Sequence, residues 1–502
     1  MLDWAASGAM SLTGPPDGPP TASPAPVLQL LRAVTAQLAR LTKETGHEVR
    51  ADPAELLTSR AALAGFSRRA QVSAGGACYL LPAADGWAAI TLSRPDDLAA
   101  VPAVLGLLGL DAAATGDESG AGDQCGAGDQ GAARARARAL LAVAARGTPA
   151  SEFAAAAQLL GVPAAALPAG RPPAPRGARP TPGGPGPGRF TPGGPTPGSP
   201  TPGRALPDGP GPDCFTDGDP LAGAAGWPPW RTARLAPPSP AAALAGAVVA
   251  DLSAMWAGPQ CAQLLGLAGA DVIKVESPAR PDGARSGNRE FFDWLHAGHR
   301  SLAADLTTRE GRAVLAALLE SADVVIEASR PRALAAAGLA PGMLRPRAGQ
   351  VWLSITGYGQ AVPERVAFGD DAAVAGGLVG WTGHGSAAEP VFCADAVADP
   401  LTGVCAALAV ALSRARGGGE HIDLPMAAVA AAFAAAPGLG PHLVLPDGSV
   451  SCPRTGRTQA VLPPRRPAPP PGRAPGPGRA QAPELGADTA AVLGWLAGRL
   501  AC

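Results

Sequence analysis

A tract rich in proline and glycine, residues 168–240, divides this chain of 502 residues into two parts. Its centre reads TPGGPGPGRFTPGGPTPGSPTPGR, in which proline removes backbone donors and glycine adds conformational entropy that folding must overcome. Such a sequence cannot bury enough apolar surface to form a core. We therefore expect a disordered linker between two folded units. A second Pro/Arg-rich stretch lies in the tail, residues 441–502, which we expect to end in a short helix.

The overall composition argues against several functional classes. The 40 basic and 41 acidic residues nearly balance, so nothing indicates a nucleic-acid partner. The eight cysteines show no CxxC spacing, which argues against a metal site and against a disulfide framework. We see no signal peptide, and apolar stretches such as 401–412 are shorter than the roughly 20 residues that a bilayer requires. We therefore expect a cytoplasmic protein that binds neither membranes nor nucleic acid and holds no metal.

The second part of the chain, residues 241–440, alternates short apolar runs with helical patterns such as 311–322. The strand candidates are 246–253, 270–276, 323–329 and 350–359. This repetition predicts a Rossmann-like parallel sheet with helices packed on its faces. Ligands of such sheets bind beyond the carboxyl ends of the strands.

The first part, residues 1–167, predicts a smaller α+β domain. Residues 26–46 carry Leu, Val and Ala at helical spacing and end at Gly46, a C-cap candidate. Residues 77–93 predict a β-hairpin that turns at Ala84–Asp85–Gly86. The expected fold class is therefore α/β, with a parallel sheet and a smaller α+β domain separated by the linker.

Successive motifs in the second part resemble the family III CoA-transferases, which include formyl-CoA transferase, carnitine CoA-transferase and the bile-acid-inducible F type. The resemblance starts with DLSAMWAGPQCAQLLGLAGADVIKVESP and continues in family order through SITGYGQ, GDDAAVAGGLVGWTG and DPLTGVCAALAVAL. The first part resembles a later portion of the same family, through WAASGAMSLTGPPDGPP and SAGGACYLLPAADGWAAITLS. The chain thus resembles two partial family units in reversed order. We expect them to complement one another within the chain or across a homodimer.

This resemblance implies transfer of coenzyme A between carboxylic acids, with acyl-CoA and a carboxylic acid as substrates and no permanently bound cofactor. The family's catalytic aspartate corresponds to Asp17, which would form an aspartyl-CoA thioester intermediate. The family's glycine loop corresponds to Ser73–Gly76, so Gly75 and Gly76 would cover the reacting group. The alternative is that both segments are ordinary turns without a catalytic role, because Asp and Gly are common in turns.

Candidates for CoA binding follow the predicted strands. The backbone of Ala257, Gly258 and Pro259 opens a helix, where amide groups can face a phosphate, and the sequence is not a GxGxxG motif. The cationic candidates for the CoA phosphates are Lys274, Arg300, Arg330 and Arg332. Each of these residues is equally consistent with an ordinary solvent-exposed position that has no role in binding.

The second part departs from the family pattern at several positions near the CoA site. Ser277 stands where the family often has Arg, and Ala328–Ser329 stands where it often has Asn-Phe. The CoA contacts are therefore expected to be altered, which leaves open a degenerate, non-catalytic acyl-CoA-binding protein.

Asp371 leaves a further alternative open. α-Methylacyl-CoA racemases use an aspartate in a similar Gly-x-Asp setting with a histidine upstream, because proton removal next to a thioester needs two opposed acid/base groups. The segment 339–350, where that histidine would fall, contains none. His296 and His299 lie further upstream, which ranks the racemase second.

Overall fold

The computed structural model describes residues 1–110, 127–169, 221, 225–329, 331–383, 385–436, 438, 442–468 and 481–500. Most of the expected disordered linker, together with Arg330, lies outside these residues.

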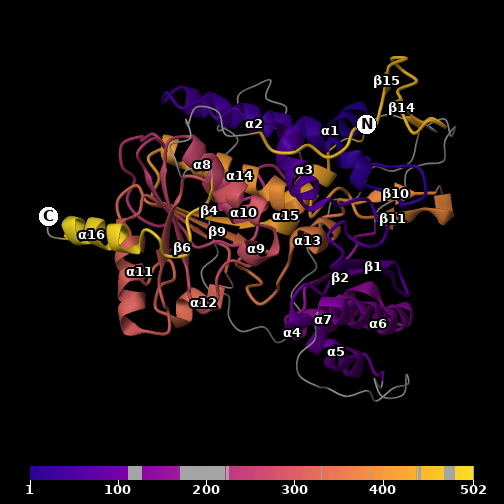
Figure 1. Cartoon of the computed structure of the whole chain (residues 1–502), viewed down its shortest axis with the longest axis horizontal. Helices are drawn as coiled ribbons and strands as arrows, with labels where there is room; N and C mark the ends of the chain where they lie inside the picture. The colour runs from indigo at the N-terminus through magenta and orange to yellow at the C-terminus, as the bar shows by residue number, and fades with distance from the viewer. Residues whose placement is uncertain are drawn as a thin grey trace.

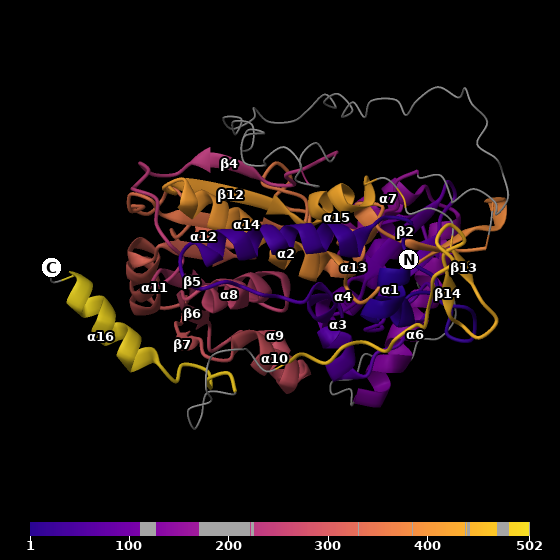
Figure 2. The same ribbon diagram turned by 90° about the horizontal axis from the view of Figure 1, so that it is seen from above.

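A seven-stranded sheet forms the centre of the larger unit, in the order β4-β12-β9-β8-β5-β6-β7 (Figures 1 and 2). Its strands are β4 Arg231–Arg234, β5 Val248–Asp251, β6 Asp271–Glu276, β7 Arg300–Ala303, β8 Val324–Glu327, β9 Val351–Thr356 and β12 Glu420–Pro425. All neighbours are parallel except β4 and β12. The expected parallel sheet is therefore confirmed as a mostly parallel one. One correction concerns β4, which lies inside the range expected to be linker but pairs with the edge of the sheet.

Helices cover both faces of this sheet, which explains why β5 and β8 are buried along their whole length. One face packs against α8 (Ala257–Leu267) and α14 (Ala398–Ala415), and the other against α11 (Arg309–Ser321) and the terminal helix α16 (Thr489–Leu500). The helix expected at the end of the tail is thus present. Within the described residues α14 is the one helix long and apolar enough to cross a membrane, and 89% of it is buried in the fold, as in a core helix.

The smaller unit contains the antiparallel sheet β1-β2-β3, with strands Cys78–Pro82, Trp87–Thr91 and Ala164–Ala166. Its register from Cys78↔Thr91 to Pro82↔Trp87 confirms the hairpin expected around Asp85. A separate apolar core joins this sheet to the helices beside it (Figure 1). These helices are α4 Pro95–Ala99, α5 Val101–Leu107, α6 Ala127–Arg146 and α7 Ala150–Leu159.

The two parts pack together within the single chain. Helix α2 (Val27–Lys43), at the place expected for a helix, lies in the main core against α14 (Figure 2). Gln158 of the small unit exchanges two hydrogen bonds with the backbone of Val366, at 2.8 and 2.9 Å. Such contacts bring the linker-separated parts into one structure.

Shorter elements complete the fold. In the first part they are α1 Leu2–Ser7, η1 Ala9–Leu12 and α3 Pro53–Ala64. In the second part they are α9 Gly283–Gly287, α10 Arg289–His296, α12 Pro331–Ala336, α13 Gly369–Ala375, β10 Gly380–Thr382, η4 Gly385–Ala387, β11 Glu389–Val391, α15 Met426–Ala434, β13 Leu443–Val444, β14 Val450–Ser451 and β15 Thr458–Gln459.

Candidate functional site

Asp17 is exposed on a turn that the second part of the chain holds in place. The turn closes through a 3.0 Å bond from the Thr21 amide to the Thr13 carbonyl. The Thr21 hydroxyl donates to the carbonyl of Trp381 at 2.9 Å, and the Thr13 hydroxyl accepts from the amide of Ala394 at 2.9 Å. Trp381 belongs to β10, so the two TG-containing segments of the chain lie side by side.

Residues 68–70 form hydrogen bonds with the backbone of the same turn. Arg68 donates from Nε to the carbonyl of Pro15 at 2.8 Å and from Nη2 to the carbonyl of Gly18 at 3.1 Å. The Ala70 amide donates to the carbonyl of Gly14 at 2.9 Å. The backbone on both sides of Asp17 is therefore fixed, while its carboxylate is left exposed.

The glycine segment 73–76 forms a tight turn directly before β1. The amide of Gly76 donates to the carbonyl of Ser73 at 2.8 Å, and Gly76 has a φ of +80°, which favours glycine. The Ser73 hydroxyl accepts from the amide of Cys78 at 3.1 Å and is also hydrogen-bonded to Asp370. The segment is thus anchored to the first turn of α13 in the second part of the chain.

Arg60 connects the glycine segment with the second part of the chain. Its Nη1 lies 2.8 Å from Oδ1 of Asp395, a carboxylate with no exposed surface. Its guanidinium carbon lies 5.5 Å from the ring of Trp256, the residue before α8, and 5.3 Å from the ring of Phe66. A side chain at Gly75 would contact its Nη2. Arg60 therefore contacts Asp395 and Trp256 at once and lies beside the glycine segment.

Two further carboxyl groups, those of Asp370 and Asp399, are partly buried and interact with Arg60 of this ion pair. Burial raises the pKa of Asp370 to about 7, with repulsion from Asp395 acting in the same direction. Burial likewise raises the pKa of Asp399 to about 7, although the charge of Arg60 opposes the shift. The carboxyl groups thus outnumber the one guanidinium among them, so low-dielectric burial favours their protonated forms.

The predicted CoA ligand Lys274 lies in a buried ion network instead of at an open surface. Its Nζ lies 3.2 Å from Asp282 Oδ2 and 3.7 Å from Asp251 Oδ2, and it donates to the carbonyl of Ser253. The residue is only 1% exposed. This arrangement fixes the loops that follow β5 and β6, and a contact with CoA stays a prediction.

Three other predicted CoA ligands lie together at the start of α8. Ala257, Gly258 and Pro259 open α8 as expected and are buried, with Gly258 packed so closely that a Cβ would fall 2.2 Å from Ser253 Oγ. Their role in binding CoA stays a prediction.

Arg300 and Arg332 lie apart from this helix start. Arg300 begins β7 and is paired with Asp271 at the start of β6, so it lies at the amino ends of the strands, opposite the expected ligand edge. Arg332 is exposed, 3.0 Å from Glu364. Their positions do not support phosphate binding at a single site, and Arg330 lies outside the described residues.

Asp371, the acid/base candidate of the racemase alternative, lies in a buried hydrogen-bonded position. It is fully buried and accepts hydrogen bonds from the Thr91 hydroxyl at 2.8 Å and the Phe368 amide at 3.0 Å, at the start of α13. Burial raises its pKa to about 7. His296 and His299 face one another, with their Nδ1 atoms 3.3 Å apart. Among the described contacts nothing joins either histidine to Asp371.

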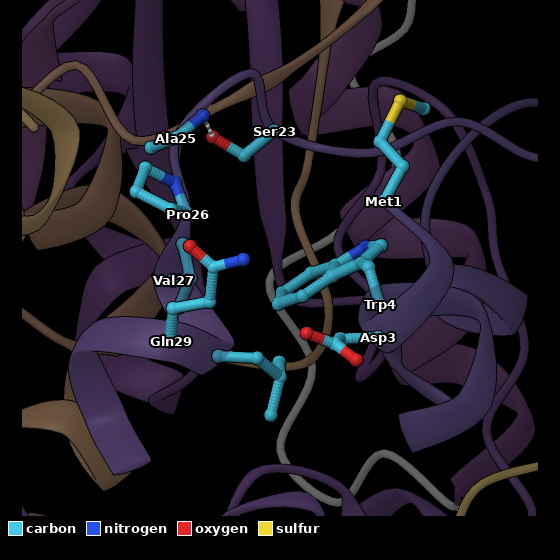
Figure 3. Close-up of a pocket in the computed structure, with 9 residues that line it drawn as sticks. Met1, Asp3, Trp4, Ser23, Ala25, Pro26, Val27 and Gln29 are labelled. Atoms are coloured by element: carbon cyan, nitrogen blue, oxygen red, sulfur yellow. Dashed lines mark hydrogen bonds between the residues drawn. The ribbon is translucent and has the colours of Figure 1, made fainter. Parts of the chain in front are cut away.

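A small hollow lies between α1 and the start of α2 (Figure 3). Its walls include Met1, Asp3 and Trp4 on one side and Ser23 and Gln29 on the other. Its volume is about 10 Å³, about the room that one water molecule needs. It cannot hold an acyl-CoA, and it includes none of the predicted site residues.

A mostly parallel sheet with helices on both faces, joined to a small α+β unit, defines an α/β protein with two interlocked parts. Residues 244–466 match the sequence profile of CoA-transferase family III, and this portion of the chain belongs to that family. The family expected from the sequence motifs is therefore confirmed. The matched range excludes residues 1–167, so the two-unit interpretation stays a prediction.

Several known proteins are similar to part of this chain. The succinate–glutarate CoA-transferase of Agrobacterium fabrum is 38% identical over 205 residues, which cover 36% of this chain and 50% of the relative. The succinyl-CoA–D-citramalate CoA-transferase of Chloroflexus aurantiacus is 33% identical over 190 residues, 35% of this chain and 47% of the relative. A solved CAIB/BAIF family protein from Brucella suis is 33% identical over 39% of this chain and 55% of its own, with a TM-score of 0.34. The chain spans about half the length of the curated relatives it matches.

Sequence reasoning missed the residues that connect the two parts. Arg60, Asp395 and Asp399 were not singled out, although two acids inside the apolar run VFCADAVADPL were a visible anomaly. Arg68 and Arg69, the paired arginines before the glycine segment, were also overlooked.

Proposed function

We propose that this protein transfers coenzyme A between carboxylic acids, with Asp17 as the nucleophile. The observation that carries the proposal is the position of the Asp17 turn, which is hydrogen-bonded to Trp381 of β10 and to Ala394 after β11, both in the family-matched portion. An exposed carboxylate on a fixed backbone is suited to attack a bound thioester, because little ordering remains to be done.

The reaction balances without an oxidant or a net proton. The Asp17 carboxylate attacks the donor thioester, forming a mixed anhydride and releasing CoA thiolate. The thiolate attacks the aspartyl carbonyl, which releases the donor acid and leaves an aspartyl-CoA thioester. The acceptor carboxylate then forms a second anhydride and expels CoA thiolate again, and attack on the acceptor's carbonyl gives the new acyl-CoA and free Asp17.

The glycine segment supplies the second element of the proposed site. Gly75 and Gly76 present backbone instead of side chains. Because the Gly76 amide closes the turn to Ser73, the Gly75 amide is the proposed donor to the oxyanion that forms at each attack. Ser73 ties this backbone to Asp370, and Arg60 lies beneath Gly75. The Gly75 amide would therefore be fixed in position before the reaction begins.

The names of the relatives guide the choice of substrates. They include a succinate–glutarate and a succinyl-CoA–D-citramalate CoA-transferase, so small dicarboxylic acids are the first acceptors to try. A homodimer and a cytoplasmic location belong to the same proposal. The α-methylacyl-CoA racemase alternative gains no support, because Asp371 is enclosed by Thr91 and Phe368.

The test is exchange of label between a ¹⁴C-labelled acid and a panel of acyl-CoA thioesters. We expect exchange with the natural sequence, loss of at least a thousandfold in D17N, and no change in D96N, an exposed aspartate of the small unit. Hydroxylamine added with the acyl-CoA should convert Asp17 to its hydroxamate. CoA binding without exchange would instead favour the non-catalytic acyl-CoA-binding protein. Racemisation of a 2-methylacyl-CoA that survives D17N and is lost in D371N would favour the racemase.

A further inference from the structure

Three arginines lie around the Asp17 turn and the glycine segment, and they differ in how their charge is used. Arg60 is ion-paired with Asp395, and Arg68 donates to the backbone carbonyls beside Asp17. Arg69 is exposed and forms no ion pair among the described residues. Of the three, Arg69 alone has its positive charge available to a ligand.

The backbone fixes where Arg69 lies. Its carbonyl accepts from the amide of Val72 at 3.0 Å, and the next residue, Ala70, has a φ of +56°, which is unfavourable for alanine. Ala70 is held in this conformation on both sides, by donating to Gly14 and by accepting from Phe392 at 3.1 Å. Backbone strain that surrounding contacts maintain clusters at active sites and ligand-binding segments.

The guanidinium of Arg69 lies over the glycine segment. Its Nη1 is 2.7 Å from the place where a Cβ of Gly76 would stand, so a side chain there would displace the guanidinium. The same peptide segment contacts the Asp17 turn through Arg68 and Ala70. The guanidinium of Arg69 therefore lies beside Gly76, and both of its sequence neighbours contact the Asp17 turn.

We propose that Arg69 binds the carboxylate of the acid substrate as that acid approaches Asp17. This rests on the proposed function and names the residue that recognises the acid. A guanidinium fits a carboxylate with two parallel hydrogen bonds. The site also needs a cation for electrostatic reasons. The carboxyl cluster of Asp370, Asp395 and Asp399 does not attract an incoming anion.

The test compares R69M, R69K and the control R457M, which removes an exposed arginine on the turn before β15. In R69M we expect the KM for the acid to rise at least tenfold and the KM for acyl-CoA to change less than twofold. R69K should recover part of the loss, since it keeps the charge without the planar fork. R457M should match the natural protein.

Equilibrium binding separates this proposal from the transfer reaction itself. Succinate, CoA and dephospho-CoA are titrated calorimetrically into each variant. If the natural protein binds succinate and R69M does not, Arg69 recognises the acid even where no transfer occurs. An unchanged succinate affinity in R69M, or no succinate binding by the natural protein, overturns the proposal. A loss of CoA affinity in R69M that dephospho-CoA does not show also overturns it, because Arg69 would then bind the 3′-phosphate.

Discussion

Arg60 and Asp395 lie 2.8 Å apart although 335 positions separate them in the sequence. Arg60 comes from α3 of the first part, and Asp395 precedes α14 of the second. The pair therefore connects the parts of the chain on either side of the Pro/Gly tract, at the place where the glycine segment meets the family-like portion.

Removing one partner of this ion pair should destabilise the folded protein. Asp395 has no exposed surface, so R60M leaves a buried carboxylate without its cation, and we expect the free energy of unfolding to fall by about 3–5 kcal/mol. Urea denaturation measures the change. The exposed pair Arg32–Asp3 is the control, for which R32M should cost less than about 1 kcal/mol. Equal costs for both variants would refute a special role of Arg60.

The carboxyl cluster predicts a particular pH dependence of stability. The pKa values of Asp370 and Asp399 are raised by burial from 3.8 to about 7, so between these limits the folded state binds more protons than the unfolded state. The free energy of unfolding should therefore fall as pH rises from about 4 to about 7. D399N removes one of these titrating groups and should flatten the fall, whereas D96N should leave it unchanged. A D399N curve that parallels the natural one would contradict the assignment.

The burial of Lys274 among carboxylates favours a role in stabilising the fold over the contact with the CoA phosphates that the sequence predicted. K274M leaves Asp251 and Asp282 without their buried cation, and we expect a loss of about 3–5 kcal/mol. The ratio of affinities for CoA and dephospho-CoA isolates a 3′-phosphate contact, and it should stay within twofold of the natural value. A tenfold drop in that ratio would instead restore Lys274 as a phosphate ligand.

The two glycines of the loop should respond differently to alanine. Gly76 has a φ of +80° and lies against Arg69, so G76A should cost about 1–2 kcal/mol and lower the transfer rate. Gly75 has an ordinary φ and its added Cβ would meet Arg60 Nη2 at 3.5 Å, so G75A is the milder change. Equal rates in the two variants would argue against a fixed loop conformation.

The local parts of this fold were predictable from the sequence. The hairpin around Asp85 and the helix from Val27 to Lys43 were expected from turn residues and from helical spacing, which act over a few positions. The parallel sheet was expected because strand and helix patterns alternate. Strand β4 was missed because it lies within a Pro-rich range and pairs with a strand far along the chain.

The site could be predicted only in part. Family motifs indicated Asp17 and the glycine segment, but no local pattern shows that Arg60 meets Asp395 or that Lys274 is buried. Those contacts depend on how distant segments pack. An arginine or lysine after a strand looks the same in sequence whether it faces solvent or a buried carboxylate, as the different settings of Arg300 and Lys274 illustrate.

The central claim is that Asp17 exchanges acyl groups with the substrates, and oxygen labelling tests it most directly. In the proposed reaction the bridging oxygen of the second anhydride comes from the acceptor acid and remains on Asp17 when the new acyl-CoA leaves. With ¹⁸O-labelled succinate as acceptor, mass spectrometry of the peptide that contains Asp17 should show one ¹⁸O after a turnover. CoA exchange with no label in that peptide, or with label at another carboxylate, would contradict the account.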